Sequence, residues 1–177
     1  MKKGNNPIAL VDFAFKKQAP LDAGANAVIN AVITWFMLRG VTSIPVISPP
    51  GSEFAKSLLG TLFPPAVVIA FAISILTSKT AVRKRIKGDV LPPLQAGTSW
   101  VKNALKWGLI RAVVNILVVY GIGGIIVQFA PDLQVSRSAA ALIVGIIAAL
   151  LAYLESATAV LRTPNARSSA VLPFTAK

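Results

Sequence analysis

Four long apolar stretches limit what this chain can fold into more than any other feature of its sequence. A helix of about 20 residues rises roughly 30 Å, which is the thickness of the hydrocarbon core of a bilayer. The sequence therefore predicts an all-α integral membrane protein in which four transmembrane helices form a bundle. The stretches run from about Asp22 to Leu38, Leu58 to Leu76, Trp107 to Phe129 and Ser138 to Leu161.

The composition agrees with this class and excludes several kinds of chemistry. Hydrophobic residues make up 55% of the 177-residue chain and charged residues 14%, whereas soluble domains carry about a quarter charged residues. The absence of cysteine and histidine removes the usual ligands of zinc and haem and the common nucleophiles and proton carriers. The six carboxylates are scattered along the chain. We therefore expect no enzyme activity, no metal site and no cofactor, and only a pigment held through asparagine or water stays open.

The distribution of lysine and arginine predicts the orientation of the spans. Fourteen of these 18 residues lie before the first span, between the second and third spans, or after the fourth, and three lie on the other side. Arg111 lies within the third span and is not counted. Cytoplasmic loops of membrane proteins carry an excess of lysine and arginine. Both termini and the central link are therefore expected in the cytoplasm, in a bacterial-type inner membrane. Their partners there are anionic lipid headgroups and not nucleic acid.

Five segments follow from this topology. An amphipathic helix is expected to lie on the membrane surface at the N-terminus, with Pro20 breaking the chain before the first span; a tail without structure is the alternative. The segments are the surface helix at 1–20, the first transmembrane hairpin at 21–86, a cytoplasmic linker at 87–98, the second hairpin at 99–163 and a cytoplasmic tail at 164–177.

A short repeat suggests that the two hairpins are copies of one unit. The stretch "SKTAV" (78–82), which follows the second span, resembles "SATAV" (156–160) at the end of the fourth, at an offset of 78 residues. At an offset of 85 residues, "AVINAVITW" (27–35) aligns with "AVVNILVVY" (112–120). Both matches fall in the same order and at equivalent depth, as a duplication around an axis along the membrane normal predicts. Chance matches in a chain rich in alanine and valine are the alternative.

One face of the first span is polar. Asp22, Asn26, Asn30 and Thr34 recur every four residues and therefore lie above one another on a helix. Unpaired amides in hydrocarbon cost several kcal/mol, so we expect this face to meet protein or water. In one interpretation the amides bond across to Asn115 and hold the bundle together. In the other they line a path for a small polar solute.

Small residues at regular spacing predict where the helices approach one another, because they let two backbones come close in a membrane. The first span carries one such ridge beside its polar face, the fourth span carries another, and glycines of the third span extend the pattern. The residues are Ala23, Ala27 and Ala31, then Ala141, Gly145 and Ala149, and finally Gly121 and Gly124.

Two charged residues lie within the spans. Glu155 is the only acid well inside a span, and Arg111 lies at a similar depth if the third and fourth spans are antiparallel. A carboxylate in a span is expected to pair with a cation or to stay protonated. Either this pair fixes the register of two helices, or Glu155 takes up and releases a proton or a cation.

These observations favour a non-catalytic function. We expect a structural or accessory subunit that packs through its small-residue ridges and intramembrane polar contacts, as a homo-oligomer or within a larger membrane complex. The alternative is a small transporter or channel for an ion, a proton or a small polar solute. It would use the asparagine-lined seam and Glu155.

Overall fold

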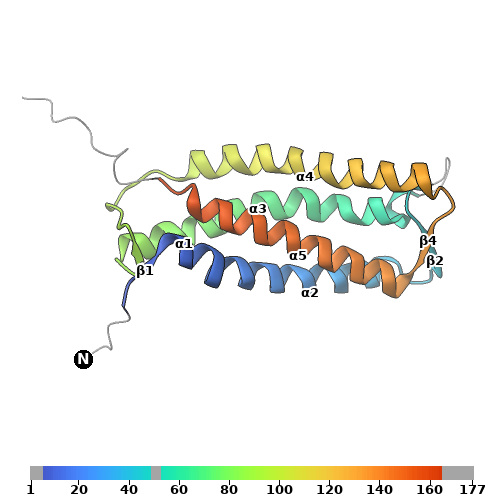
Figure 1. Cartoon of the computed structure of the whole chain (residues 1–177), viewed down its shortest axis with the longest axis horizontal. Coiled ribbons are helices and arrows are strands. Elements are labelled where there is room, and N and C mark those ends of the chain that lie inside the picture. The colour runs from blue at the N-terminus through green and yellow to red at the C-terminus, as the bar shows by residue number, and fades with distance from the viewer. Residues whose placement is uncertain (1–5, 49–52, 165–177) are drawn as a thin grey trace, which may run out of the picture.

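Four long helices form the body of the molecule. The computed structural model describes residues 6–48 and 53–164. The chain runs up and down along one axis, so the second and fourth of these helices are parallel to each other and antiparallel to the first and third (Figure 1). The expected all-α architecture is therefore confirmed. The helices are α2 (Ala19–Met37), α3 (Leu58–Ile86), α4 (Val101–Phe129) and α5 (Arg137–Leu161).

Three of these helices, α3, α4 and α5, are long and apolar enough to cross a membrane. Helix α2 has 19 residues and is not among them. Its Asp22, Asn26 and Asn30 are the polar residues that the sequence places on one face, and they lower its hydropathy. The first expected span is thus a helix, but a more polar one than the other three.

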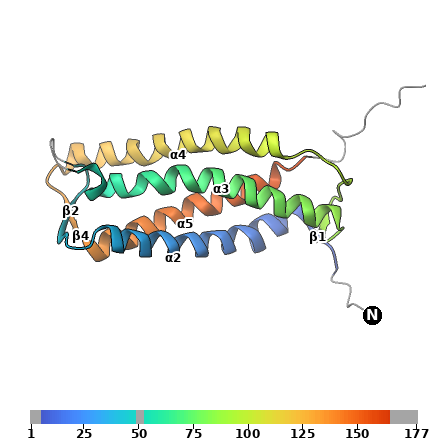
Figure 2. The same ribbon diagram turned by 180° about the vertical axis from the view of Figure 1, so that it is seen from behind.

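The helices do not pack as two separate hairpins. Helix α2 lies along α5, and α3 lies along both α5 and α4, while α2 with α3 and α4 with α5 make few contacts. The order across the molecule is therefore α2, α5, α3, α4, and both views place α2 and α4 on opposite sides (Figure 2). The first helix of each predicted hairpin packs on the second helix of the other. Exchanging α2 with α4 and α3 with α5 leaves this pattern of contacts unchanged.

Corresponding positions of α2 and α4 face the interior. The 85-residue offset that aligns the two segments in the sequence also aligns their buried side chains. Each of the two helices therefore uses the same face to pack on its neighbour. The buried pairs are Ala19 with Ala104 and Thr34 with Val119; directly after α2, buried Leu38 corresponds to buried Gly123.

Helices α3 and α5 also resemble each other in local detail. Each begins after a serine whose hydroxyl oxygen accepts a backbone N–H three residues later, Ser57 in one case and Ser136 in the other. Such a bond satisfies one of the free N–H groups of the first turn. Near the other end, Thr80 and Thr158 each donate to the carbonyl four residues earlier.

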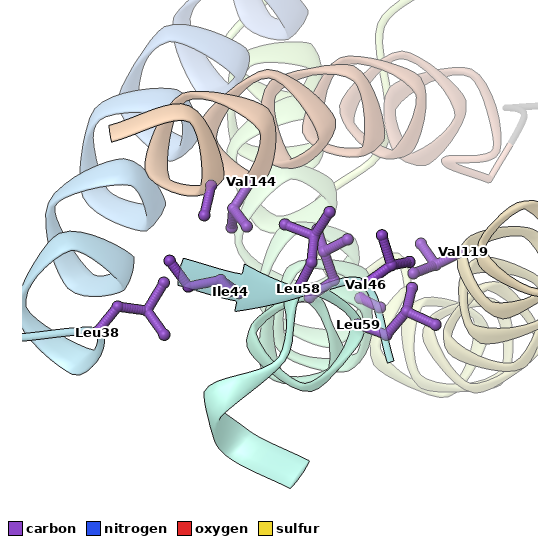
Figure 3. Packing of buried hydrophobic residues seen from close by; sticks show 10 residues of the cluster. Leu38, Ile44, Val46, Leu58, Leu59, Val119 and Val144 are labelled. Atoms are coloured by element: carbon purple, nitrogen blue, oxygen red, sulfur yellow. The ribbon is translucent and has the colours of Figure 1, made fainter. Parts of the chain in front are cut away.

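A short antiparallel strand pair closes one end of the bundle. Strand β2 (Ser43–Pro45) follows α2, and β4 (Gln134–Ser136) follows α4. A 3₁₀ turn, η2 (Phe54–Lys56), precedes α3. The buried side chains of Ile44, Leu59 and their neighbours gather around β2, between the helices (Figure 3).

The N-terminal segment continues directly into α2. Strand β1 (Ile8–Ala9) pairs in parallel with β3 (Val90–Leu91), and α1 (Leu10–Asp12) and a π-helical stretch η1 (Phe13–Gln18) follow it. Pro20 therefore does not break the chain, contrary to expectation. The wider π-helical turns directly before it accommodate a residue that cannot donate a backbone hydrogen bond.

This segment is held against the bundle by its inner side chains. Phe13 and Ala14 are buried against the ends of α3 and α5, while Val11 and Phe15 are 58% and 41% exposed. It is thus an extension of α2 that presents two apolar side chains outward. We call this end of the molecule the basic end, because it carries Lys16, Lys17, Arg83, Lys84, Arg85, Lys87, Lys102 and Lys106.

A buried arginine closes the basic end. The Nε atom of Arg85 donates to the carbonyl of Pro92 at 2.8 Å, and Nη1 donates to the Thr163 hydroxyl at 2.7 Å and to the carbonyl of Pro164 at 2.8 Å. These bonds tie the end of α3 to the linker before α4 and to the residues after α5. The remainder of the predicted tail, 165–177, lies outside the described residues.

Candidate functional site

The carboxylate of Asp22 joins three helices near the basic end. Thr77 Oγ1 of α3 donates to Asp22 Oδ2 at 2.9 Å, and Ser156 Oγ of α5 donates to the same atom at 2.7 Å. Gln18 Nε2 lies 3.1 Å from both carboxylate oxygens. Neutral donors thus satisfy the carboxylate, and none of the ion pairs within the described residues involves it. We call these four residues the Asp22 junction.

Glu155 lies in a second polar junction, where α5 meets α3 and α4. Its side chain is 2% exposed, and Arg111 Nε lies 3.9 Å from Glu155 Oε1. The two charges attract each other at this distance, but it is too long for a hydrogen bond. The side chain of Asn115 lies beside the same carboxylate. The structure thus brings together the two charged residues that the sequence places at similar depth.

A second arginine borders this junction. The guanidinium carbon of Arg162 lies 3.6 Å from the centre of the Trp107 ring, and Asn103 Nδ2 donates to the Arg162 carbonyl at 2.8 Å. Burial lowers the pKa of Arg162, and the like charge of Arg111 acts in the same direction, while Glu155 opposes both. We call Glu155, Arg111, Arg162 and Trp107 the Glu155 junction.

The cavity in the Glu155 junction is small. Its volume is about 10 Å³, which is roughly the smallest space that holds a single water. The chamber seen in this structure has room for about one water molecule. Besides the charged residues, its lining includes Ser74, Ser78, Asn103 and Thr158.

The two junctions occupy corresponding places in the two halves of the molecule. At the 78-residue offset, Thr77 corresponds to Glu155 and Ser78 to Ser156. Ser156 donates to Asp22, and Ser78 lines the cavity beside Glu155. The hydroxyl partners of Asp22 were not predicted, although the repeated pentapeptides contain one of them, Ser156, and adjoin the other, Thr77.

The asparagines do not form the predicted seam. Asn26 Nδ2 donates to the Asp22 carbonyl at 2.8 Å, and Asn30 Nδ2 donates to the Asn26 carbonyl at 2.9 Å, both within α2. Asn115 is buried on α4 and donates to the Ala66 carbonyl of α3 at 3.1 Å. Because α2 and α4 lie on opposite sides of the α3–α5 pair, these amides belong to separate sites.

The amides of α2 face a lateral groove between α2 and α3. The groove has a volume of about 210 Å³, and Asn26, Asn30 and Thr34 line one wall. Pro64 and Pro65 lie on the other wall, where α3 continues through both prolines. Besides these side chains, Thr61 adds a polar group to the lining, and each amide already uses one of its N–H groups within α2.

Small residues make close contacts where α2 meets α5 and where α4 meets α3. A Cβ atom on Gly145 would lie 2.9 Å from the Ala27 carbonyl oxygen and 3.0 Å from the Ala31 Cβ. A Cβ atom on Gly123 would lie 2.5 Å from a methyl group of Leu59. Two of the predicted ridges thus meet at Gly145. The other ridge residues comprise Ala23 and Ala149, which are half-buried, and Ala141, which is buried.

Two glycines of α4 differ from the prediction. Gly121 and Gly124 are exposed, and no atom of a neighbouring described residue lies within 4 Å of where their Cβ atoms would be. They therefore do not make the close contact that was expected within the chain. Gly123, between them, points inward instead.

Comparisons with known proteins add no further guide to function. No protein-family model, curated protein or solved structure matches this chain. Among the described residues, no group of three or more aspartate or glutamate side chains is placed to hold a metal ion. Function must therefore be inferred from the side chains and their geometry.

Proposed function

We propose that the protein is a non-catalytic structural or accessory subunit of a membrane assembly. In this proposal all four long helices cross the membrane, and the basic end faces the cytoplasm. The three long apolar helices support insertion, and the concentration of lysine and arginine at one end supports the orientation. The exchangeable contact pattern of the four helices supports an origin from two copies of one hairpin.

The observation that carries the proposal is the outward face of α4. This helix is the least covered of the three long apolar helices. Gly121 and Gly124 lie on its exposed side and carry no side chains, and we call this position the notch. The exposed side chains of Val113 and Leu117 lie on the same helix, nearer the basic end. Small residues on an uncovered transmembrane helix allow close approach of another helix, and packing of this kind drives association in membranes.

The polar sites fit a structural role better than a path for solutes. The Asp22 carboxylate and the α2 amides are bonded within the bundle, and the cavity at Glu155 measures only about 10 Å³. Polar groups of this kind hold helices in register, at roughly 1 kcal/mol or less for each bond.

The proposal is tested by filling the notch. The variant Gly121→Leu/Gly124→Leu is expected to lower the mass of the assembly purified in mild detergent, because the added side chains keep the second helix away. Gly24→Leu is the matched control: Gly24 is also exposed and has no neighbour within 4 Å, but it lies on α2. Copurification of differently tagged copies separates a homo-oligomer from a complex with another protein. An unchanged mass and an unchanged set of partners in the α4 variant would contradict the proposal.

A second candidate function is proton or ion movement through the Glu155 junction. The observation in its favour is a buried carboxylate whose only cation within 4.0 Å, among the described residues, is 3.9 Å away. In proteoliposomes, a flux that Glu155→Gln abolishes and Glu53→Gln leaves intact would support it and overturn the structural role. Glu53 is the matched control because its side chain is 69% exposed.

A further inference from the structure

We propose that the basic end contains a site for the headgroup of one anionic phospholipid, between Lys17 and Lys84. The inference rests on the membrane insertion proposed above, and it is independent of the assembly role. A hollow of about 430 Å³ lies there, between the N-terminal segment and the turn that follows α3. Its lining combines two cations with a floor of buried apolar side chains.

The two lysines are available for an anion. Lys16 is paired with Asp12 at 2.6 Å, and the Asp12 carboxylate raises the pKa of Lys16. Within the described residues, Lys17 and Lys84 belong to none of the ion pairs. Lys84 Nζ lies 4.8 Å from the centre of the Phe13 ring, which holds it at the wall of the hollow. A phosphate between these two ammonium groups would gain two charge-assisted contacts.

The floor of the hollow is apolar and fixed. Phe13 and Val90 are each 1% exposed and belong to the same buried cluster, and Ile8 packs against them. The Ile8 N–H donates to the Asp89 carbonyl at 3.1 Å, at the start of the β1–β3 pair. Backbone pairing therefore holds the two walls together before any ligand binds.

The one acid in the lining makes the site selective. Asp89 lines the hollow and also an adjoining hollow of about 300 Å³, whose other charged residues are Arg83, Lys84 and Lys87. The cations outnumber the acid in both hollows, so the field favours an anion. Asp89 adds an acceptor for a headgroup hydroxyl, so a phosphodiester with a glycerol headgroup matches this lining better than a bare phosphate.

The position of the hollow favours a lipid as the source of the phosphate. The charged residues of α3 begin at Lys79 and gather from Arg83 to Arg85, after its apolar part, so they lie at headgroup level if α3 crosses the membrane. The exposed Val11 and Phe15 on the same N-terminal segment would reach the acyl region.

The test counts lipids retained by the full-length chain. The protein is reconstituted in nanodiscs of phosphatidylglycerol and phosphatidylcholine in equal parts, released into mild detergent and weighed by native mass spectrometry. The variant Lys17→Gln/Lys84→Gln is expected to lose one bound phosphatidylglycerol, with an affinity roughly tenfold lower or more. The matched control Lys102→Gln/Lys106→Gln removes the same charge from exposed positions at the same end and is expected to keep it.

Each other outcome overturns the site. Equal loss in both double variants would show attraction by surface charge alone, and equal retention of phosphatidylcholine would show no preference for anionic lipid. Displacement of the lipid by millimolar inorganic phosphate would assign the site to the free anion. Lys17→Gln alone is measured as well, because Lys17 is exposed and its loss should not disturb folding. Failure of the wild-type chain to enter nanodiscs would refute membrane insertion itself and so is distinguishable from failure of the site.

Discussion

Two carboxylates at the same level of the bundle are satisfied in different ways. Asp22 accepts hydrogen bonds from neutral side chains on its own helical segment, on α3 and on α5. Glu155 faces Arg111 at 3.9 Å, with Arg162 behind it. The positions correspond in the two halves, but the carboxylate lies on the first helix in one junction and on the last helix in the other.

This difference in partners determines how each junction is expected to respond to mutation. The hydroxyl groups of Thr77 and Ser156 are buried, so they depend on Asp22 as their acceptor. Arg111 is 23% exposed and carries a long flexible chain that can turn to the surface. The Asp22 junction is therefore a fixed link between three helices, and the Glu155 junction is an adjustable one.

The largest effect is expected from Asp22→Ala. The change leaves the hydroxyl groups of Thr77 and Ser156 without their acceptor, and each buried unsatisfied group costs about 1–3 kcal/mol. We expect a loss of about 2–4 kcal/mol in the free energy of unfolding, measured by denaturant titration in mixed micelles. Asp22→Asn keeps one acceptor oxygen and should lose about half as much. Equal stability of Asp22→Ala and the wild type would show that the junction does not stabilise the fold.

A smaller effect is expected from adding a methyl group where helices meet. Gly145→Ala forces α2 and α5 apart, because the new Cβ would lie 2.9 Å from the Ala27 carbonyl oxygen. Such overpacking costs about 1–3 kcal/mol. Gly108 is the matched control on the α4–α3 side, since its nearest neighbour would be a Phe71 ring carbon at 3.3 Å. Gly108→Ala should change the melting temperature little. Equal losses in the two variants would contradict the difference in available space at the two positions.

The elements of this fold were predictable because they depend on local pattern. Long apolar runs give helices near the expected positions, and the small-residue spacing places Ala27, Ala31 and Gly145 on helix faces that can meet. The continuation of the helix through Pro20 was not predictable from the same pattern. A π-helical stretch absorbs it, and that conformation depends on how Phe13 and Ala14 are anchored against other helices.

The partners within the candidate sites were less predictable because they depend on which helices adjoin. An asparagine in a helix can bond to its own backbone or to a neighbour, and Asn30 takes the first course while Asn115 takes the second. Glycines at 121, 123 and 124 point in several directions, so spacing alone did not identify Gly123 as the inward one. The repeat was the best available signal, because its offsets relate the two junctions.

The Glu155 junction is expected to contribute less to the free energy of unfolding than the Asp22 junction does. A double-mutant cycle with Glu155→Gln, Arg111→Gln and the combined variant measures the coupling of the two charges. We expect about 1 kcal/mol or less, because one partner reaches the surface and the atoms are too far apart to share a hydrogen bond. A coupling above about 3 kcal/mol would show that the pair is held as rigidly as the Asp22 junction, and the two junctions would then not differ in this respect.

The smallest effect compares the two asparagines that the sequence aligns. Asn115→Ala removes a hydrogen bond from α4 to the Ala66 carbonyl of α3, and interhelical bonds of this kind average about 0.6 kcal/mol in a membrane. Asn30→Ala removes a bond within α2 and should leave the free energy of unfolding unchanged within about 0.3 kcal/mol. Both are measured by the same denaturant titration as the Asp22 variants. If Asn30→Ala proved the more costly change, α2 would be held by its amides, and its attachment to α5 would no longer be explained by the Asp22 junction and the contact at Gly145.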